Sequence, residues 1–337
     1  MARASLDPAK FRDPARTAEG KPRARVAFRT LKTLWFNTGT LCNLTCENCY
    51  IESSPRNDRL VYLSAEEVAR FLDELGSNGW RTEEIGFTGG EPLMNPDIIA
   101  MLEDSLQRGY RTLVLTNAMR PMMKQARALR DLHRRFARKL VLRVSVDHYT
   151  PELHEAERGP RSWKPMLAGL TWLAEHGFTI HVAGRTRWNE DETRLREGYA
   201  RFFAANGIAL DAQDRAQLVL FPEMDEKADV PEITESCWEI LNVERDSLMC
   251  ATSRMVVKRK GEERPVVMPC TLLPYDKRFE MAETLAGATH EVALNHPHCA
   301  RFCVLGGGAC SVTAERNTGS QGSPHGAITG QARSSPR

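Results

Sequence analysis

The chain has 337 residues, of which 42% are hydrophobic, and 46 basic against 44 acidic residues leave a formal net charge of +2. This balance argues against a nucleic-acid partner, and no apolar run approaches the ~18 residues of a membrane-spanning helix. The nine cysteines are an odd number and no apolar segment opens the chain, which argues against a secreted, disulfide-bonded protein. We therefore expect a cytoplasmic protein with one domain of roughly 200 residues and a smaller module.

The two ends of the chain differ from the rest in composition. Residues 1–32 carry nine Lys and Arg residues against three acidic ones and show little apolar periodicity, which predicts a basic flexible arm. Residues 313–337 are rich in Gly, Ser, Thr and Pro and predict a disordered tail.

Between the ends, short apolar runs alternate with amphipathic ones. The apolar runs are typical of parallel strands buried on both faces, and they span 34–37, 84–88, 112–116, 140–146, 178–183 and 217–221. Helices are expected over 64–75, 96–107, 122–136, 163–176 and 191–205, the first opened by a capping box from Ser64 to Glu67. About six β/α units are fewer than the eight of a closed barrel, so we predict an α/β fold with a partial, open β/α barrel over 33–235.

Three cysteines, Cys42, Cys46 and Cys49, follow the first predicted strand. A zinc site normally adds a nearby Cys or His pair, and none follows before His133. Iron–sulfur cubanes are normally held by four Cys thiolates, so three leave one iron open to a substrate or cofactor. This loop therefore predicts an iron–sulfur reaction centre, with structural zinc or unrelated buried thiols as the alternative.

Other polar residues follow the later strands. Active sites of parallel β/α folds lie at the carboxyl ends of the strands, so residues that follow the strands meet on one rim. Beside the three-Cys loop these residues are Gly89, Gly90, Glu91, Pro92, Asn117, Asp147, His148, Arg185 and Glu223.

The spacing of the three cysteines, together with Thr88-Gly89-Gly90-Glu91-Pro92, resembles the radical S-adenosylmethionine (radical SAM) superfamily. The resemblance implies a [4Fe–4S] cluster on Cys42, Cys46 and Cys49, with S-adenosylmethionine (SAM) bound beside it. It also implies an enzyme that reductively cleaves SAM to a 5′-deoxyadenosyl radical, which abstracts hydrogen from a substrate carbon. Such an enzyme takes its electron from a reductase, flavodoxin or ferredoxin.

The resemblance also assigns roles around SAM. The stretch from Gly89 to Pro92 is similar to the element that binds the SAM amino group. Ser145 and Asp147 are similar to a Ser-x-Asp stretch that contacts the ribose or carboxylate. The remaining expected contacts are Asn117, Arg158 and Arg185 as polar ligands and Phe221 against the adenine. Many family members have an aromatic residue before the third Cys, whereas here that residue is Asn48 and the aromatic is Tyr50.

Six of the nine cysteines follow residue 236, and Cys250 and Cys270 flank an expected hairpin around Gly261. Residues 236–312 thus resemble the auxiliary-cluster module, called twitch or SPASM, of some radical SAM enzymes. We predict one auxiliary [4Fe–4S] cluster, and Cys237 is expected to be a small buried hydrophobe instead. The candidate ligands are Cys250, Cys270, Cys299 and Cys303, with Cys310 as a substitute. A zinc site on the same thiolates, or on Cys with His296 or His298, remains the alternative.

Oxidation of a substrate also requires a base within hydrogen-bond reach of it. Glu223 and His148 are the candidates for this catalytic role. The substrate is a small molecule or a peptide; the ~32 residues before the first strand are too few and too polar for a leader-binding domain, which weakens the peptide option. A peptide-modifying (RiPP-type) maturase is thus the alternative function. A non-catalytic iron–sulfur or zinc protein, which would not bind SAM, is the remoter one.

Overall fold

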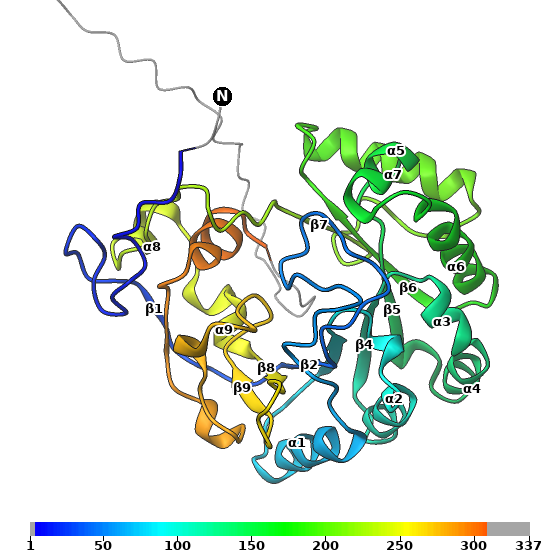
Figure 1. Ribbon diagram of the computed structural model, residues 1–337, viewed down its shortest axis with the longest axis horizontal. Helices are drawn as coiled ribbons and strands as arrows, with labels where there is room; N and C mark the ends of the chain where they lie inside the picture. Colours follow the sequence, from blue (N-terminus) through cyan, green and yellow to red (C-terminus); the bar gives the residue numbers. More distant parts are fainter. Residues whose placement is uncertain (1–3, 309–337) are drawn as a thin grey trace, which may run out of the picture.

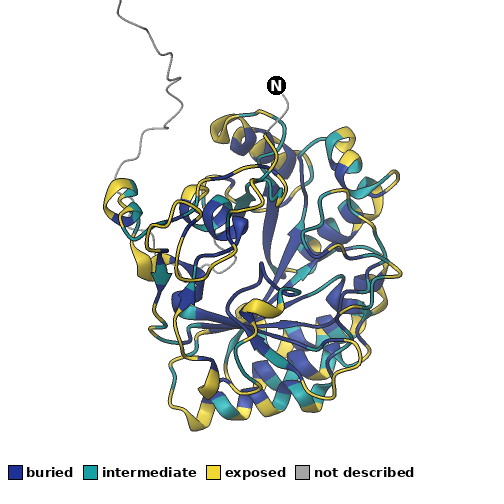
Figure 2. Cartoon of the chain, turned by 60° about the vertical axis from the view of Figure 1, so that its left-hand side comes forward, coloured by how far each residue is buried: buried dark blue, intermediate teal, exposed yellow. Residues whose placement is uncertain are grey.

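The computed structural model describes residues 4–308. Its framework is an eight-stranded sheet in the order β7-β6-β5-β4-β3-β2-β8-β9. All neighbouring strands from β7 to β8 are parallel, and only β8 and β9 are antiparallel. Figure 1 shows helices on the outer side of this sheet, and Figure 2 shows its strands as mostly buried. The predicted α/β fold, an open and incomplete barrel, is confirmed.

The six predicted strands form close to their expected positions. They are β2 (Thr33–Asn37), β3 (Glu84–Thr88), β4 (Arg111–Thr116), β5 (Leu140–Ser145), β6 (Thr179–Arg185) and β7 (Leu218–Phe221). The helices between them are α1 (Ala65–Ser77), α2 (Ile98–Gln107), α3 (Arg120–Lys124), α4 (Ala126–Phe136), α5 (Pro151–Arg158), α6 (Trp163–Glu175) and α7 (Glu192–Ala205). The capping box at α1 forms, because Ser64 accepts a hydrogen bond from Glu67 N and the Glu67 side chain accepts one from Ser64 N.

Two helices differ from expectation. The helix expected over 122–136 is broken into α3 and α4 at Gln125, whose N–H turns back to the carbonyls of Met122 and Met123. The short helix α5 was not expected, because its buried residues are the polar His154 and Glu157 rather than an apolar stripe.

The two faces of each strand have different environments. Along β5, Leu140, Leu142 and Val144 join the apolar core under the helices. Arg143 and Ser145 alternate with them and line a cavity on the opposite, concave face. The helices therefore cover an apolar face, and polar side chains are gathered inside the open barrel.

The residues after 236 continue the same sheet instead of forming a separate layer. The predicted hairpin exists as β8 (Ser253–Val257) and β9 (Val266–Met268), and β8 lies parallel to β2 with Thr33 opposite Ser253. The other elements here include α8 (Cys237–Leu241), α9 (Met249–Thr252), β10 (Val292–Ala293), the π-helix η6 (Cys299–Leu305) and three short 3₁₀ helices. The first strand of the barrel and the Cys-rich module thus support each other directly.

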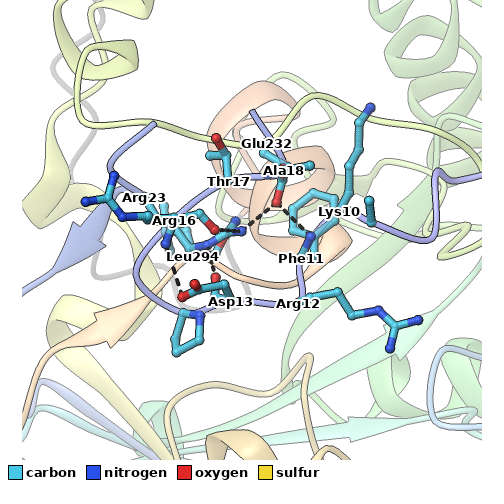
Figure 3. Close-up of polar contacts among 12 residues, drawn as sticks. Lys10, Phe11, Arg12, Asp13, Arg16, Thr17, Ala18, Arg23, Glu232 and Leu294 are labelled. Carbon is cyan, nitrogen blue, oxygen red and sulfur yellow. Dashed lines mark hydrogen bonds and ion pairs between the residues drawn. The ribbon is translucent and has the colours of Figure 1, made fainter. Parts of the chain in front are cut away.

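The N-terminal segment is a correction to the sequence prediction. We expected residues 1–32 to be a flexible arm, but Phe11 is only 3% exposed and Arg23 only 2%. Figure 3 shows Arg23 enclosed by this segment, with an ion pair to Glu232 at 2.5 Å and a hydrogen bond from its Nε to Asp13 O at 2.7 Å. Strand β1 (Arg25–Val26) then pairs with β10. Four of the basic residues have acidic partners that are distant in sequence, which composition cannot reveal: Lys10, Arg23, Arg25 and Arg29.

Two predictions lie outside the described residues, namely Cys310 as a substitute ligand and the tail over 313–337. Within residues 4–308, no helix has the length and apolar character needed to span a bilayer.

Candidate functional site

A cavity of about 150 Å³ lies at the carboxyl ends of the parallel strands. It is lined by most of the residues that the sequence singled out as candidates. These are Cys42, Cys46, Cys49, Gly89, Gly90, Asn117, Ser145, Asp147, Arg158, Arg185 and Phe221. Arg143, Tyr50 and Met224 also line it, and sequence reasoning assigned none of them a role here. Glu91, Pro92, His148 and Glu223 are absent from its wall.

The three-Cys loop offers donors to its own sulfur atoms. Leu44 N donates to Cys42 Sγ and Ser53 N donates to Cys49 Sγ, each at 3.4 Å. Burial raises the pKa of the Cys42 thiol to about 12, so loss of its proton has to be coupled to metal binding. N–H groups aimed at sulfur are one way in which proteins stabilise iron–sulfur clusters. The donor set therefore fits a cluster held by three thiolates.

The glycine pair fixes the start of this loop. A Cβ atom on Gly90 would lie 2.2 Å from the carbonyl oxygen of Leu41, and one on Gly89 would lie 2.4 Å from that of Gly39. Gly90 N donates to Gly39 O at 2.8 Å, which keeps the two backbones together. The two glycines are thus required by close backbone packing, and they also leave backbone open to the cavity.

Glu91 lies beneath the cavity and holds other residues in position. Its carboxylate accepts hydrogen bonds from Leu93 N, Thr116 Oγ1 and Asn117 N, and burial raises its pKa to about 7. Asn117 in turn donates from Nδ2 to Asn43 Oδ1 at 2.9 Å. Pro92 is also buried, as the first residue of the 3₁₀ helix η1 (Pro92–Met94). Glu91 and Pro92 are therefore not part of the cavity wall, and their expected contact with a ligand stays a prediction.

Asp147 is the centre of a charged group in the cavity. Arg158 Nε lies 2.5 Å and Arg185 Nε 3.3 Å from its carboxylate oxygens. Burial alone would raise the pKa of Asp147, but the two guanidinium charges hold it below its ordinary value. With Arg143 also on the wall, three arginines and one carboxylate face the cavity. This excess of positive charge suits a ligand that carries a carboxylate.

Glu157 is a buried residue that sequence reasoning missed. Its side chain, 0% exposed, accepts hydrogen bonds from Asn48 N at 3.0 Å and Asn48 Nδ2 at 2.9 Å, and pairs with Arg187 at 2.7 Å. Helix α5 thereby fastens the middle of the three-Cys loop. A lone Glu in a polar helix carries no sequence signal for this role, although the unusual Asn48 was a hint.

Neither candidate base lines the cavity. His148 accepts a hydrogen bond from Thr150 N at Nδ1, which places its proton on Nε2, 2.9 Å from Glu190. Both ring nitrogens of His148 thus have hydrogen-bond partners outside the cavity, Thr150 and Glu190. Glu223 lies in the chain between Phe221 and Met224, which both line the cavity, while Glu223 itself does not.

A second, smaller cavity gathers the predicted auxiliary ligands. Cys250, Cys270, Cys299 and Cys303 line it together with His298 and apolar side chains. Burial raises the pKa of the Cys250 thiol to about 11 and that of Cys299 to about 12. Cys237 is not on this wall, and its Sγ lies 3.3 Å from Thr234 Oγ1 instead. The ring of Phe221, which lines the first cavity, stacks on the ring of Phe302 of η6 with centroids 5.8 Å apart.

Comparison of the sequence with known proteins matches residues 36–193 to the Radical SAM superfamily. The chain is 29% identical over 191 residues to the antilisterial bacteriocin subtilosin biosynthesis protein AlbA of Bacillus subtilis, covering 55% of this chain and 40% of AlbA. It is also 29% identical over 164 residues to the AdoMet-dependent heme synthase of Methanosarcina barkeri, covering 46% of this chain and 43% of that protein. The chain thus spans less than half the length of these two curated relatives.

Solved structures resemble the fold more broadly. SuiB of Streptococcus suis, bound to the precursor peptide SuiA, superposes with a TM-score of 0.55 at 15% identity over 76% of this chain and 63% of SuiB. Histidine-tagged anSMEcpe with bound AdoMet has a TM-score of 0.55 at 13% identity, over 76% of this chain and 79% of that protein.

Proposed function

We propose that this chain, which carries a radical SAM domain over residues 36–193, reductively cleaves SAM and abstracts hydrogen from a substrate bound in the 150 Å³ cavity. The observation that carries the proposal is the set of side chains on that cavity wall. Three thiols, the Gly89–Gly90 turn and the Asp147 group come from separate strands and face one space. A non-catalytic protein has no need of this convergence.

In this proposal Cys42, Cys46 and Cys49 hold a [4Fe–4S] cluster. The open iron position and SAM supply the one-electron chemistry. The backbone at Gly89 and Gly90 meets the amino group of SAM, and Ser145 and Asp147 meet its polar atoms. Phe221 offers an apolar surface to the adenine ring.

The other residues of the chain keep this geometry and exclude water. Glu157 holds Asn48, and Glu91 holds Asn117, so the loop is fixed at two points before any ligand binds. Arg158 and Arg185 keep Asp147 ionised at neutral pH, because their charges lower its pKa. Glu223 stays the proposed base, on the condition that the segment after β7 turns it toward the substrate. His148 is the weaker candidate because its Nε2 already faces Glu190.

The second cavity supports an auxiliary cluster. Cys250, Cys270, Cys299 and Cys303 line it, and four thiolates are the usual ligands of a [4Fe–4S] cluster. A zinc site on the same thiolates, or on Cys with His296 or His298, stays the alternative.

A peptide is the second candidate for the substrate. The relatives include a bacteriocin biosynthesis protein in sequence and a precursor-peptide complex in fold. We therefore propose a peptide-modifying maturase as the alternative to a small-molecule enzyme. A precursor peptide encoded next to this gene, incubated with the reduced protein and SAM, should lose hydrogen in a mass spectrum. An unchanged peptide mass, with SAM cleaved, would favour the small-molecule alternative.

The main test is a triple variant, Cys42→Ala, Cys46→Ala and Cys49→Ala, reconstituted without oxygen. We expect it to lose about half of the iron and all formation of 5′-deoxyadenosine with dithionite as reductant, because three thiolates hold one of two clusters. Iron is measured chemically and the nucleoside by liquid chromatography. The control Cys237→Ala should retain both. Unchanged iron in the triple variant, or wild-type protein that does not bind labelled SAM in dialysis, would refute the proposed function.

A further inference from the structure

Positive charge is concentrated on one surface, which we call the basic surface and define as residues 120–139. It contains eight basic residues and one acidic residue, Asp131, in a chain whose net charge is only +2. All eight are exposed: Arg120, Lys124, Arg127, Arg130, Arg134, Arg135, Arg138 and Lys139. The segment forms α3, α4 and the 3₁₀ helix η2 (Ala137–Lys139), and α3 and α4 lie at the right-hand side of Figure 1.

Packing explains why these charges point outward. Leu129 is 0% and Leu132 2% exposed, and both belong to the apolar core under the helices. The arginines of α4 therefore lie on the opposite side of the helix. Two of them have acidic partners, since Arg134 pairs with Asp131 and Arg135 with Glu103. For the other six, no ion pair forms with another described residue, so the surface keeps a large positive field.

The basic surface begins at the three-Cys loop. Asn43, the residue after Cys42, donates from Nδ2 to Met119 Sδ at 3.9 Å, and Asn117 donates to Asn43 at 2.9 Å. Met119 immediately precedes Arg120, the first residue of α3. A protein that docks at the α3 end of this surface is thus brought next to the loop that would receive an electron. The other end lies where the strands begin, since Lys139 directly precedes β5 and donates to Gly109 O, just before β4.

We propose that the basic surface is the docking site of an acidic one-electron carrier protein. This inference rests on the proposed function, because only a reductive reaction needs an electron at the three-Cys loop. In the step that docking serves, the carrier loses one electron and the metal site at the loop gains it, with no bond made or broken. Such encounters use small interfaces, and charge complementarity raises their association rate.

Nucleic acid is the other polyanion that fits positive charge. Proteins that bind single-stranded nucleic acid stack its bases on exposed aromatic side chains. Phe136 is the one Phe, Tyr or Trp of the basic surface, and it is partly buried in the core. His133 is stacked on Phe178 at 4.5 Å. The position beside the three-Cys loop and this lack of stacking platforms favour a protein carrier.

The test compares two matched charge reversals in the full chain. The docking variant is Lys124→Glu with Arg127→Glu, and the control is Arg194→Glu with Arg201→Glu on α7, which changes the net charge equally at exposed positions. An acidic flavodoxin with its reductase, or dithionite, supplies electrons. Formation of 5′-deoxyadenosine is measured at low and high salt, and flavodoxin binding is measured separately by flavin fluorescence.

We expect the docking variant to lose about tenfold or more of the flavodoxin-driven rate and of the binding affinity at low salt, because steering by charge is lost. Its dithionite-driven rate should stay within about twofold of wild type, and the control should match wild type throughout. The wild-type rate with flavodoxin should fall as salt rises, whereas that of the docking variant should change little. If the proposed function is wrong, wild type will form no 5′-deoxyadenosine even with dithionite. The binding measurement would then still decide whether the basic surface is the docking site.

Equal flavodoxin binding by wild type and the docking variant would overturn the inference. It would also be overturned if the control lost as much affinity as the docking variant, since a general charge effect would then explain both. Loss of binding to a labelled RNA with normal flavodoxin kinetics would assign the surface to nucleic acid instead.

Discussion

At the scale of single residues, the site depends on buried polar and charged side chains of helix α5. Asn48 stands where radical SAM relatives often have an aromatic residue, and the structure shows that its amide is held by Glu157. His154, on the same helix, is fully buried, and its ring contacts Trp163 edge-on at 5.4 Å. Burial and the nearby Arg158 charge lower the pKa of His154 to about 4. The helix that fastens the three-Cys loop is therefore sensitive to acid.

Protonation of His154 destabilises the folded protein, because the folded state binds this proton less tightly than the unfolded state does. His154 has a lower pKa in the folded protein than the ordinary 6.5, so its contribution to stability is full above pH 6.5 and is lost as the pH falls toward 4. Complete protonation would cost about 3 kcal/mol. When the pH is lowered from about 7 to about 4.5, the unfolding free energy measured by urea titration should fall less for His154→Leu than for wild type. His290→Gln, at an exposed position, should follow wild type; parallel curves for His154→Leu and wild type would contradict the argument.

At the scale of elements, the Cys-rich module is built onto the barrel through β8. Because β8 pairs in parallel with β2, the strand that leads into the three-Cys loop also touches the module. Cys250 lies on α9, just before β8, and Cys299 and Cys303 lie on η6. All three line the second cavity. Helix α8, in contrast, leaves Cys237 outside it.

This arrangement predicts opposite effects for two cysteines. If the proposed second cluster is present, Cys303→Ala should lose its iron, about half of the total, while Cys237→Ala should keep it, because only the Cys303 sulfur lines the second cavity. Iron content and the iron–sulfur absorbance after anaerobic reconstitution provide the measurement. If Cys237→Ala lost the second cluster and Cys303→Ala kept it, the ligand assignment would be wrong.

At the scale of the whole molecule, the N-terminal segment closes over the Cys-rich module. Arg23 bonds to Asp13 O and Leu294 O and pairs with Glu232, while Glu232 also accepts hydrogen bonds from Phe11 N and Ala18 N. One buried ion pair thus joins three distant parts of the chain. The segment is a structural component of the fold rather than an appended arm.

Removing one partner of this pair should leave the other charge buried and unpaired. We expect Arg23→Ala to lower the unfolding free energy by about 3 to 5 kcal/mol. Arg25→Ala, whose partner Glu291 lies in an exposed pair, is the matched control and should unfold close to wild type. Both are compared in urea titrations. A loss for Arg23→Ala no larger than that for Arg25→Ala would mean that the segment does not contribute through this pair.

Local patterns in the sequence predict the six parallel strands, the capped helix α1 and the loops that carry the site. These features follow from local patterns: apolar runs form the strands, Ser64 and Glu67 form a capping box, and the three cysteines share one loop. Asp147 and Arg185 each follow a predicted parallel strand, so their place on one rim could also be predicted, and the pairing of β5 with β6 agrees with it. The fold class and most of the cavity wall could therefore be predicted.

The residues that hold the cavity wall in position from outside are set by long-range packing. Glu157 binding Asn48, Glu91 turned beneath the cavity and Arg23 paired with Glu232 all depend on contacts between segments distant in sequence. The same holds for β8 beside β2 and for His148, which faces Glu190 instead of the cavity. Local periodicity reports which face of an element is buried, but it does not report what that face meets. The partners of buried polar groups are set by the packing of the whole chain, so they were beyond prediction from the sequence.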